Sequence, residues 1–213
     1  MLGVATVVVL IVGAAIGMLI TKATSDSGSG SPSANSVDVG FAQDMKVHHL
    51  QAVTMAGVAR EKSTDQEVHD LAFDIESTQL EQVGEMTGWL TSWTQPELPP
   101  PDRTPMAWMT GPSGHSHSDT SASGVVRMPG MASPEELSKL KSLSGKDLDI
   151  FFLQLMLRHH QGAVPMAQYA VQHAGVGYVR DLAQKMVTAQ TAEVQLMTKM
   201  LATRGAQPLP APN

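Results

Sequence analysis

The chain repeats itself, and this repeat constrains its fold more than any other feature of the sequence. Aligned with itself at an offset of 111 residues, the first half matches the second without a gap. The match includes histidine and methionine, two uncommon residue types, so we infer two copies of one structural unit. The matched pairs include Met45 with Met156, His48 and His49 with His159 and His160, Ala52 with Ala163, Met55 with Met166, Gln79 with Gln190, and Met86 with Met197.

The first copy carries the signals of two helices joined by a short turn. Residues 41–60 have the apolar periodicity of a helix. Thr64 and Glu67 match a capping box at the start of the next helix. That helix is expected to run to about Trp93, before a proline-rich stretch ends it.

The second copy has the same organisation, preceded by a short extra helix. Ser133 is expected to cap this short helix, with a proline at its first position. A long helix is predicted over residues 146–173, and the last helix is expected to end at Arg204 with Gly205 as its C-cap. Strand signals are absent from the sequence.

Two amphipathic hairpins that cannot each bury an apolar face alone should dock as an antiparallel four-helix bundle. The predicted all-α domain covers residues 37–204, with its repeats at 37–93 and 133–204. A long loop, residues 94–132, joins the repeats, and residues 205–213 form a tail. A loop of this length is usually either functional or disordered.

The N-terminus has the character of a membrane segment. Residues 2–20 carry no charge and would span roughly 28 Å as a helix, close to the thickness of a bilayer core. We expect residues 1–22 to be an uncleaved transmembrane anchor, with a secretory signal as the alternative. The Ser- and Gly-rich residues 23–36 should be a flexible linker. Gly13 and Gly17 form a G-x-x-x-G motif through which two such helices could pair, giving a homo-oligomer.

Composition excludes several classes of function. The chain has no cysteine, so disulfides, thiolate metal sites and a cysteine nucleophile are ruled out. Its formal net charge of -6, without a basic stripe, argues against a nucleic-acid partner.

One helical face in each copy gathers imidazole and thioether groups, which are metal ligands. At about 100° per residue, the histidines, methionines and small alanines of each signature fall within an arc of roughly 120°. Burying four imidazoles among apolar residues would be costly without partners for them. The sequence therefore predicts a metal site, with structural hydrogen bonding and packing as the alternative. The candidate ligands are His48, His49, His159, His160, Met45, Met55, Met156 and Met166.

The partner helices add polar residues on one face each. These are Gln79, Gln82 and Met86 in the first copy, and Gln190, Glu193 and Met197 in the second. Glu193 is the one carboxylate in this set and a further candidate ligand, whereas a ferritin-like di-iron site needs four glutamates. Imidazole and thioether without thiolate suit Cu(I), and the imidazoles can also take Cu(II). We therefore expect copper as the bound metal, with Cu(I) favoured.

The long loop and the remaining histidines are weaker candidates. Met106, Met109, His115, His117, Met128 and Met131 could form a flexible soft-metal trap, but a disordered linker with incidental Met and His residues is the favoured interpretation. His69 and His173 have no histidine counterpart in the other copy and are assigned to the surface. Trp89 and Trp93 are expected to pack the first hairpin.

The signature itself resembles a known family. The segment from Phe41 to Ala56, and its second copy from Phe152 to Ala167, closely resemble the bacterial domain of unknown function 305 (DUF305), whose paired H-H-x-x-A-x-x-M-A signatures they carry. The resemblance extends over residues 37–204 and includes the Gly130-Met-Ala-Ser133 segment. It implies a ferritin-like helical bundle, exported or membrane-attached, with some relatives connected to copper binding and copper tolerance. It implies no established enzymatic activity.

Two departures from the family pattern predict that the two halves differ. Gln82 stands where the family commonly has Glu, whereas Glu193 keeps the acid in the second copy. Pro165 lies inside the second signature helix and should kink it, because proline removes a backbone donor.

The leading hypothesis is a tethered, extracytoplasmic protein, periplasmic or at the cell surface, that sequesters or buffers copper by stoichiometric binding. Cleavage of the N-terminal segment would make it a secreted protein. A redox enzyme on a ferritin-like scaffold and a structural or partner-binding module are the two alternatives.

Overall fold

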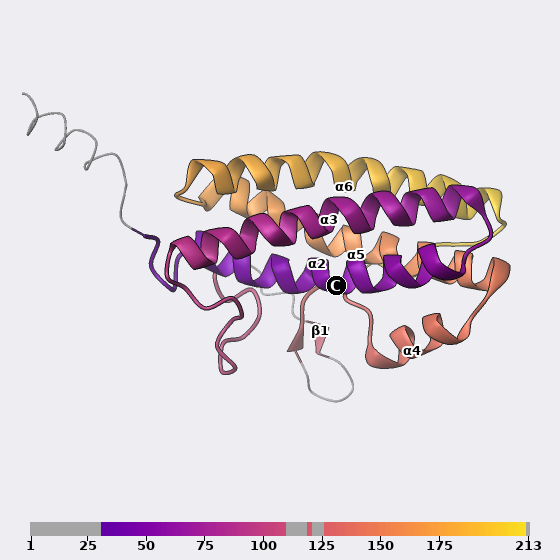
Figure 1. The fold of residues 1–213 in the computed structure, drawn as a ribbon, viewed down its shortest axis with the longest axis horizontal. Coiled ribbons are helices and arrows are strands. Elements are labelled where there is room, and N and C mark those ends of the chain that lie inside the picture. Colours follow the sequence, from indigo (N-terminus) through magenta and orange to yellow (C-terminus); the bar gives the residue numbers. More distant parts are fainter. Residues whose placement is uncertain (1–30, 110–118, 121–125, 212–213) are drawn as a thin grey trace, which may run out of the picture. The chain divides into compact units, whose positions relative to one another are not determined.

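A computed structural model describes residues 31–109, 119–120 and 126–211 (Figure 1). The predicted anchor, residues 1–22, lies outside this part, and so do His115 and His117. No helix within the described residues combines the length and apolar character that a membrane crossing requires.

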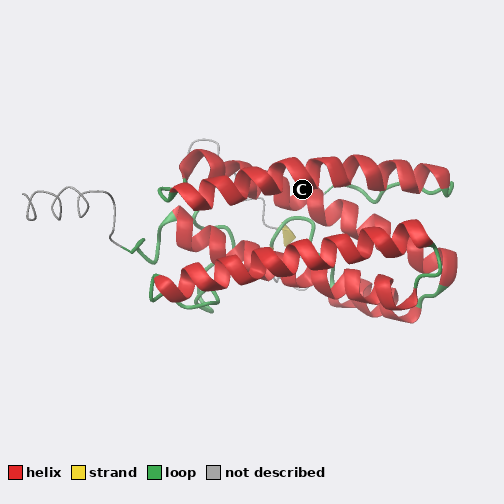
Figure 2. Cartoon of the chain, turned by 45° about the horizontal axis from the view of Figure 1, so that its top comes forward, coloured by secondary structure: helices red, strands yellow, loops and turns green. Residues whose placement is uncertain are grey.

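Helices account for nearly all of the regular secondary structure in the described residues (Figure 2). The exception is a two-residue ladder in which β1 (Asp119–Thr120) pairs antiparallel with β2 (Val126–Arg127), where no strand was expected. The five helices are α2 (Val37–Lys62), α3 (Gln66–Ser92), α4 (Pro134–Ser142), α5 (Gly145–His173) and α6 (Gly177–Thr203). Helix α5 continues through Pro165.

The helix ends follow local capping chemistry, with one correction to the sequence-based expectation. Ser133 and Glu136 form the complete capping box of α4. Gly205 follows α6 with φ of 71°, the left-handed conformation that favours glycine at this position. The capping box expected from Thr64 is wrong: Asp65 caps α3, because its carboxylate, one residue nearer the helix, accepts from the amides of Glu67 and Val68.

The order of the helices explains the long connection between the repeats. The Asp38 carboxylate at the start of α2 accepts from the backbone amide of Val176, beyond the end of α5. At the other end of α2, Lys62 Nζ donates to the carbonyl of Leu143, just before α5 begins. Helices α2 and α5 are therefore antiparallel, and α3 runs in the same direction as α5. The chain must cross the length of the bundle between these two helices, and the connection from the end of α3 to the start of α5, which includes α4, makes that crossing (Figure 1).

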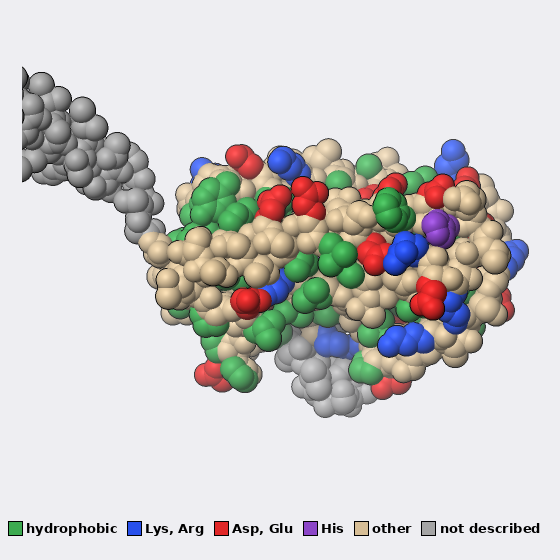
Figure 3. All heavy atoms as spheres, viewed as in Figure 1, with side chains coloured by type: hydrophobic (Ala, Val, Ile, Leu, Met, Phe, Trp, Pro, Cys, Tyr) green, Lys and Arg blue, Asp and Glu red, His purple; other side chains and the backbone are tan. Residues whose placement is uncertain are grey.

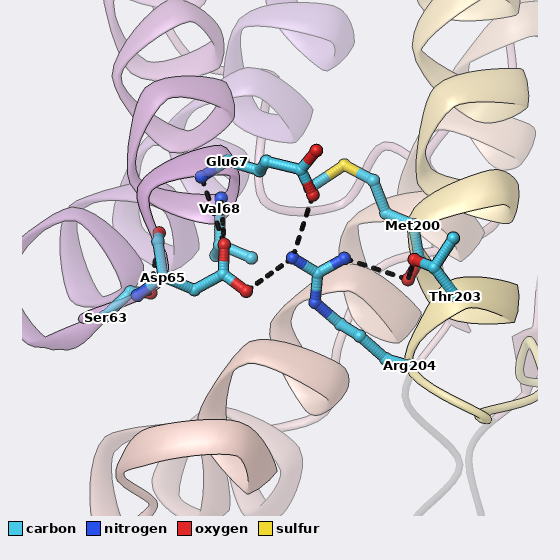
Figure 4. Close-up of polar contacts among 7 residues, drawn as sticks. All are labelled: Ser63, Asp65, Glu67, Val68, Met200, Thr203 and Arg204. Carbon is cyan, nitrogen blue, oxygen red and sulfur yellow. Dashed lines mark hydrogen bonds and ion pairs between the residues drawn. The ribbon is translucent and has the colours of Figure 1, made fainter.

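Helices α3 and α6 are joined near both ends. At one end Trp93 Nε1 donates to the Tyr178 hydroxyl at 2.9 Å, and the two rings stack. At the other end Arg204 binds the carboxylates of Asp65 and Glu67 at 2.5 and 3.2 Å (Figure 4). Trp93 lies at the end of α3 and Tyr178 at the start of α6, whereas Asp65 lies at the start of α3 and Arg204 at the end of α6. Helices α3 and α6 are therefore also antiparallel.

The interior consists of two apolar clusters, each built from all four long helices. One cluster includes Met55, Met156 and Met197. The other includes Met45, Met86 and Met166. The 111-residue repeat exchanges these two sets of methionines, so the bundle has an internal pseudo-two-fold symmetry.

Candidate metal centre

Between the two apolar clusters lies a layer of polar side chains. We call it the central polar layer; it consists of His48, His49, Gln79, Gln82, His159, His160, Gln190 and Glu193. All members except Glu193 are buried. The face of the molecule in Figure 3 accordingly shows acidic, basic and apolar side chains but little histidine. Four buried imidazoles in the middle of a bundle are costly unless their polar atoms are bonded.

One histidine of each pair is bonded to the partner helix of its own hairpin. His49 Nε2 donates to Gln82 Oε1 at 2.7 Å. In the second copy, His160 Nε2 donates to Glu193 Oε2 at 2.7 Å. The same sequence spacing therefore yields the same hydrogen bond in both copies, once to a neutral amide and once to a carboxylate.

The other two histidines meet between the hairpins. The His48 and His159 ring centroids are 3.8 Å apart, with an interplanar angle of 39°. His159 Nε2 donates to the backbone carbonyl of His48 at 3.1 Å. His48 Nε2 donates instead to the carbonyl of Pro129, at 3.0 Å. The pseudo-symmetry is therefore broken by the loop that contains Pro129.

These partners determine which ring nitrogen carries hydrogen. Carbonyl and carboxylate oxygens can only accept, so Nε2 must be the protonated atom in His48, His159 and His160. In a neutral ring the other nitrogen, Nδ1, then keeps its lone pair. The Nδ1 atoms of all four histidines are buried and have no hydrogen-bond partner, as are the Oε1 atoms of Gln79 and Gln190. The central polar layer thus contains several electron-pair donors that nothing in the described structure satisfies.

Burial favours the neutral form of three of these imidazoles, those of His48, His49 and His159. Loss of hydration lowers the pKa of His48 to about 4, although the hydrogen bond to Pro129 opposes this shift. Burial, together with the charge that His48 would carry, lowers the pKa of His49 to about 3. Burial and His48 likewise hold the pKa of His159 well below its ordinary value. The Nδ1 lone pairs of these three histidines therefore remain available in moderately acidic solution.

The other predicted ligands lie on either side of this layer. Met45 and Met166 belong to one apolar cluster, and Met55 and Met156 belong to the other. All four thioether side chains are fully buried. Glu193 is the exception among the candidates, since its side chain is 24% exposed. Within the described residues, no group of three or more His, Asp or Glu side chains is already arranged around a common metal position.

A short loop segment that the sequence analysis did not assign to the site completes it. Residues 128–132, which we call the strap, cross α2 and α5 at the histidines. Ala132 exchanges two hydrogen bonds with the Gln51 side chain, at 3.1 and 2.6 Å. A methyl group at Gly162 would collide with the Pro129 carbonyl, and Gly130 adopts φ of 79° where it approaches α5. The signal was a break in the repeat: Gly162 stands where the first copy has Gln51.

A second part of the connection is attached to α2 by Asp44, which the sequence analysis also missed. The buried Asp44 carboxylate accepts from the amide of Met106 at 2.7 Å and from Trp108 Nε1 at 2.8 Å. Arg103 pairs with the same carboxylate at 2.7 Å. Met106 is buried, and so is Met128 in the strap, whereas Met109 and Met131 are partly exposed. Met106, Trp108 and Met128 therefore pack on the bundle as part of its second apolar cluster.

Two further histidines and two tryptophans considered in the sequence lie outside the central polar layer. His173 is exposed, as expected, and His69 is partly exposed. Trp93 is buried and, with Trp89, packs near Tyr178, as expected for packing residues.

Comparisons with known proteins agree with this architecture. The family model described as domain of unknown function (DUF305) matches residues 38–201. A crystal structure of a DUF305 protein from Streptomyces coelicolor, named as one expected to be secreted, is 42% identical. It covers 84% of this chain and 99% of its own, with a TM-score of 0.73. A DUF305 fragment from Deinococcus radiodurans is 33% identical over 78% of this chain and 96% of its own, with a TM-score of 0.61.

A more distant structure shares the fold. CopM in its Cu(I)-bound form is 23% identical, covers 78% of this chain and 96% of its own, and has a TM-score of 0.58. At this identity the likeness concerns the fold alone. No curated protein matches the chain.

The strap predicts a sharp difference between two glycine substitutions. Gly162→Ala should destabilise the protein by about 2 kcal/mol, because the new methyl group displaces the Pro129 carbonyl. Gly84→Ala is the control: nothing lies near an added methyl group on this exposed face of α3, so stability should rise by up to ~1 kcal/mol. Urea unfolding measures the change in the free energy of unfolding for each variant. Equal changes in the two variants would contradict the packing of the strap against Gly162.

The lowered pKa values predict that mild acid weakens the fold. Between about pH 7 and pH 5.5, imidazoles in the unfolded chain take up protons, whereas those of His48 and His49 in the folded chain do not until about pH 4 and about pH 3. The free energy of unfolding should therefore fall by roughly 1 kcal/mol for each buried imidazole.

Urea titrations at the two pH values test this. A variant with His69→Gln and His173→Gln should keep the pH dependence, because His173 is exposed, His69 is partly exposed and neither belongs to the central polar layer. Equal stability at both pH values would show that His48 and His49 are not buried as neutral groups.

Proposed function

This chain belongs to the DUF305 family, and we propose that it binds copper, preferentially Cu(I), through the histidines of its central polar layer. Binding is stoichiometric and serves to sequester or buffer the ion outside the cytoplasm. A ferritin-like fold is part of this proposal, supported by the long connection that joins the two helical hairpins.

One observation carries this proposal. Each of the four histidines donates its Nε2 hydrogen to a fixed oxygen and leaves a buried Nδ1 without a partner. Metal-ligating histidines have this pattern, because the second nitrogen must be held by a carbonyl or carboxylate for the first to bind the metal. A purely structural histidine layer would gain stability by bonding both nitrogens.

The kinds of atom available favour copper over other metals. The layer offers neutral imidazole nitrogens, and the flanking clusters offer thioethers from Met45, Met55, Met156 and Met166. This set suits Cu(I), which accepts soft ligands and low coordination numbers. Glu193 is the only carboxylate of the layer, so the four glutamates of a di-iron oxidase are missing. CopM, on the same fold, is known in Cu(I)-, Cu(II)- and silver-bound forms.

The residues divide into ligands and groups that orient them. His48, His49, His159 and His160 supply nitrogen through Nδ1, and the four methionines assist. Gln82, Glu193 and the Pro129 carbonyl hold the rings with Nδ1 free. Because His48 and His49 stay neutral in moderate acid, the ion has no proton to displace from either ring. This property suits a protein that works outside the cytoplasm, and the likeness to a DUF305 protein named as one expected to be secreted supports that location.

Histidine-to-glutamine substitution tests the proposal directly. Glutamine keeps an N–H donor near the position of Nε2 but removes Nδ1, so the fold can persist while the ligand is lost. We expect a variant with all four substitutions, at positions 48, 49, 159 and 160, to bind Cu(I) at least 100-fold more weakly, on the order of 3 kcal/mol.

The measurement is a Cu(I) titration of the full chain against a chromophoric competitor, with circular dichroism to verify the helices. His69→Gln with His173→Gln is the matched control and should bind as the parent does. Unchanged affinity in the fourfold variant would move the site elsewhere, and absence of binding by the parent would favour a purely structural role for the histidines.

A further inference from the structure

We propose that Glu193 determines the charge of the cargo, so that the central polar layer accepts a single monovalent soft cation, Cu(I) or Ag(I). This inference rests on the proposed function and adds to it the charge, the number and the preferred half-site of the bound ion.

The central polar layer departs from its own repeat at one position. His48 matches His159, His49 matches His160, and Gln79 matches Gln190. The remaining match pairs a neutral amide, Gln82, with a carboxylate, Glu193. Both accept the same hydrogen bond at the same distance of 2.7 Å. Holding the histidine therefore does not require a negative charge, since Gln82 does it without one.

The other buried carboxylates are used elsewhere. Asp44 is paired with Arg103, and Asp38 accepts from backbone amides before α6. Asp149 is also buried, but it lies ten residues before His159 on α5, about 15 Å along the helix. Among the described residues, Glu193 is thus the carboxylate hydrogen-bonded to a histidine of the layer. Glu193 is therefore the one member of the layer with an acidic side chain, and it can supply one negative charge.

This charge limits what can enter. An ion bound between two apolar clusters loses its water, and an uncompensated charge there is very unfavourable. One Cu(I) or Ag(I) ion and the Glu193 carboxylate sum to zero. A second monovalent ion, or a divalent ion in place of the first, leaves a net positive charge in the same surroundings. The layer therefore favours one monovalent ion over both alternatives.

The partial exposure of Glu193 explains how its carboxylate can remain charged in the bundle when no metal is bound. Its side chain is 24% exposed while its partner His160 is fully buried. Water can therefore hydrate the carboxylate when no cation is present. Because the attraction falls with distance, the cation should be held nearest to His160, so the second half-site is the preferred one.

Three variants separate charge from hydrogen bonding. Glu193→Gln keeps the acceptor and removes the charge, giving the second half-site the chemistry of the first. Gln82→Glu does the reverse and adds a second charge. The double variant, Gln82→Glu with Glu193→Gln, keeps one charge and moves it to the other half-site.

We expect Glu193→Gln to weaken Cu(I) binding by about 10- to 100-fold, the usual effect of removing a group that orients and polarises a metal-binding histidine. The double variant should bind close to the parent, and Gln82→Glu should hold a second ion. Competitive titration measures the affinity. Native mass spectrometry counts the Ag(I) ions bound by each protein, and the number bound by the fourfold histidine variant is subtracted as background.

The outcomes distinguish this inference from the proposed function. If the parent binds Cu(I) and Glu193→Gln binds equally well, Glu193 only holds His160 and the inference is overturned while the proposed function stands. A parent that binds two ions in the layer would also overturn it. If the parent binds none, both fail.

Discussion

The burial of four imidazoles in the middle of the bundle imposes most of the structure around them. Each ring needs an acceptor for its N–H, and three different devices supply one: the partner helix of each hairpin, the backbone of the opposite hairpin and the strap. The strap in turn requires Gly162, which lets the Pro129 carbonyl approach, and Gln51, which holds Ala132. On either side of this layer, the helices pack against one another through apolar clusters rich in methionine.

Much of this could be predicted from sequence because it is periodic. The offset of 111 residues located both hairpins, and helical spacing placed the paired histidines, Gln82 and Glu193 on facing surfaces. The strap and the Asp44 contacts escaped prediction because they join an irregular loop to α2 across some 60 to 80 residues of sequence, and a backbone carbonyl such as that of Pro129 leaves no trace in residue identity. The misplaced cap of α3 had a local cause, since Asp65 competes with Thr64 for the same amides and also pairs with Arg204.

The positions at which the two copies differ are as informative about the site as the positions at which they match. Position 51 is glutamine in the first copy and its match, position 162, is glycine, so the strap lies across the bundle in one orientation only. Position 82 is an amide and its match, position 193, a carboxylate, which gives a nearly symmetric site an asymmetric charge. In the account proposed here, duplication supplied the four ligands, and later divergence set how the site is covered and which ion it holds.

The central claim is that copper is bound by Nδ1 of the buried histidines while Nε2 keeps its hydrogen. Nitrogen NMR of the histidine rings tests it most directly, with Ag(I), whose nucleus has spin ½, as the substitute for Cu(I). The rings should be protonated at Nε2 before silver is added, and Nδ1 should afterwards show a shift and coupling to silver. Rings protonated at Nδ1, or silver coupled to Nε2, would contradict it.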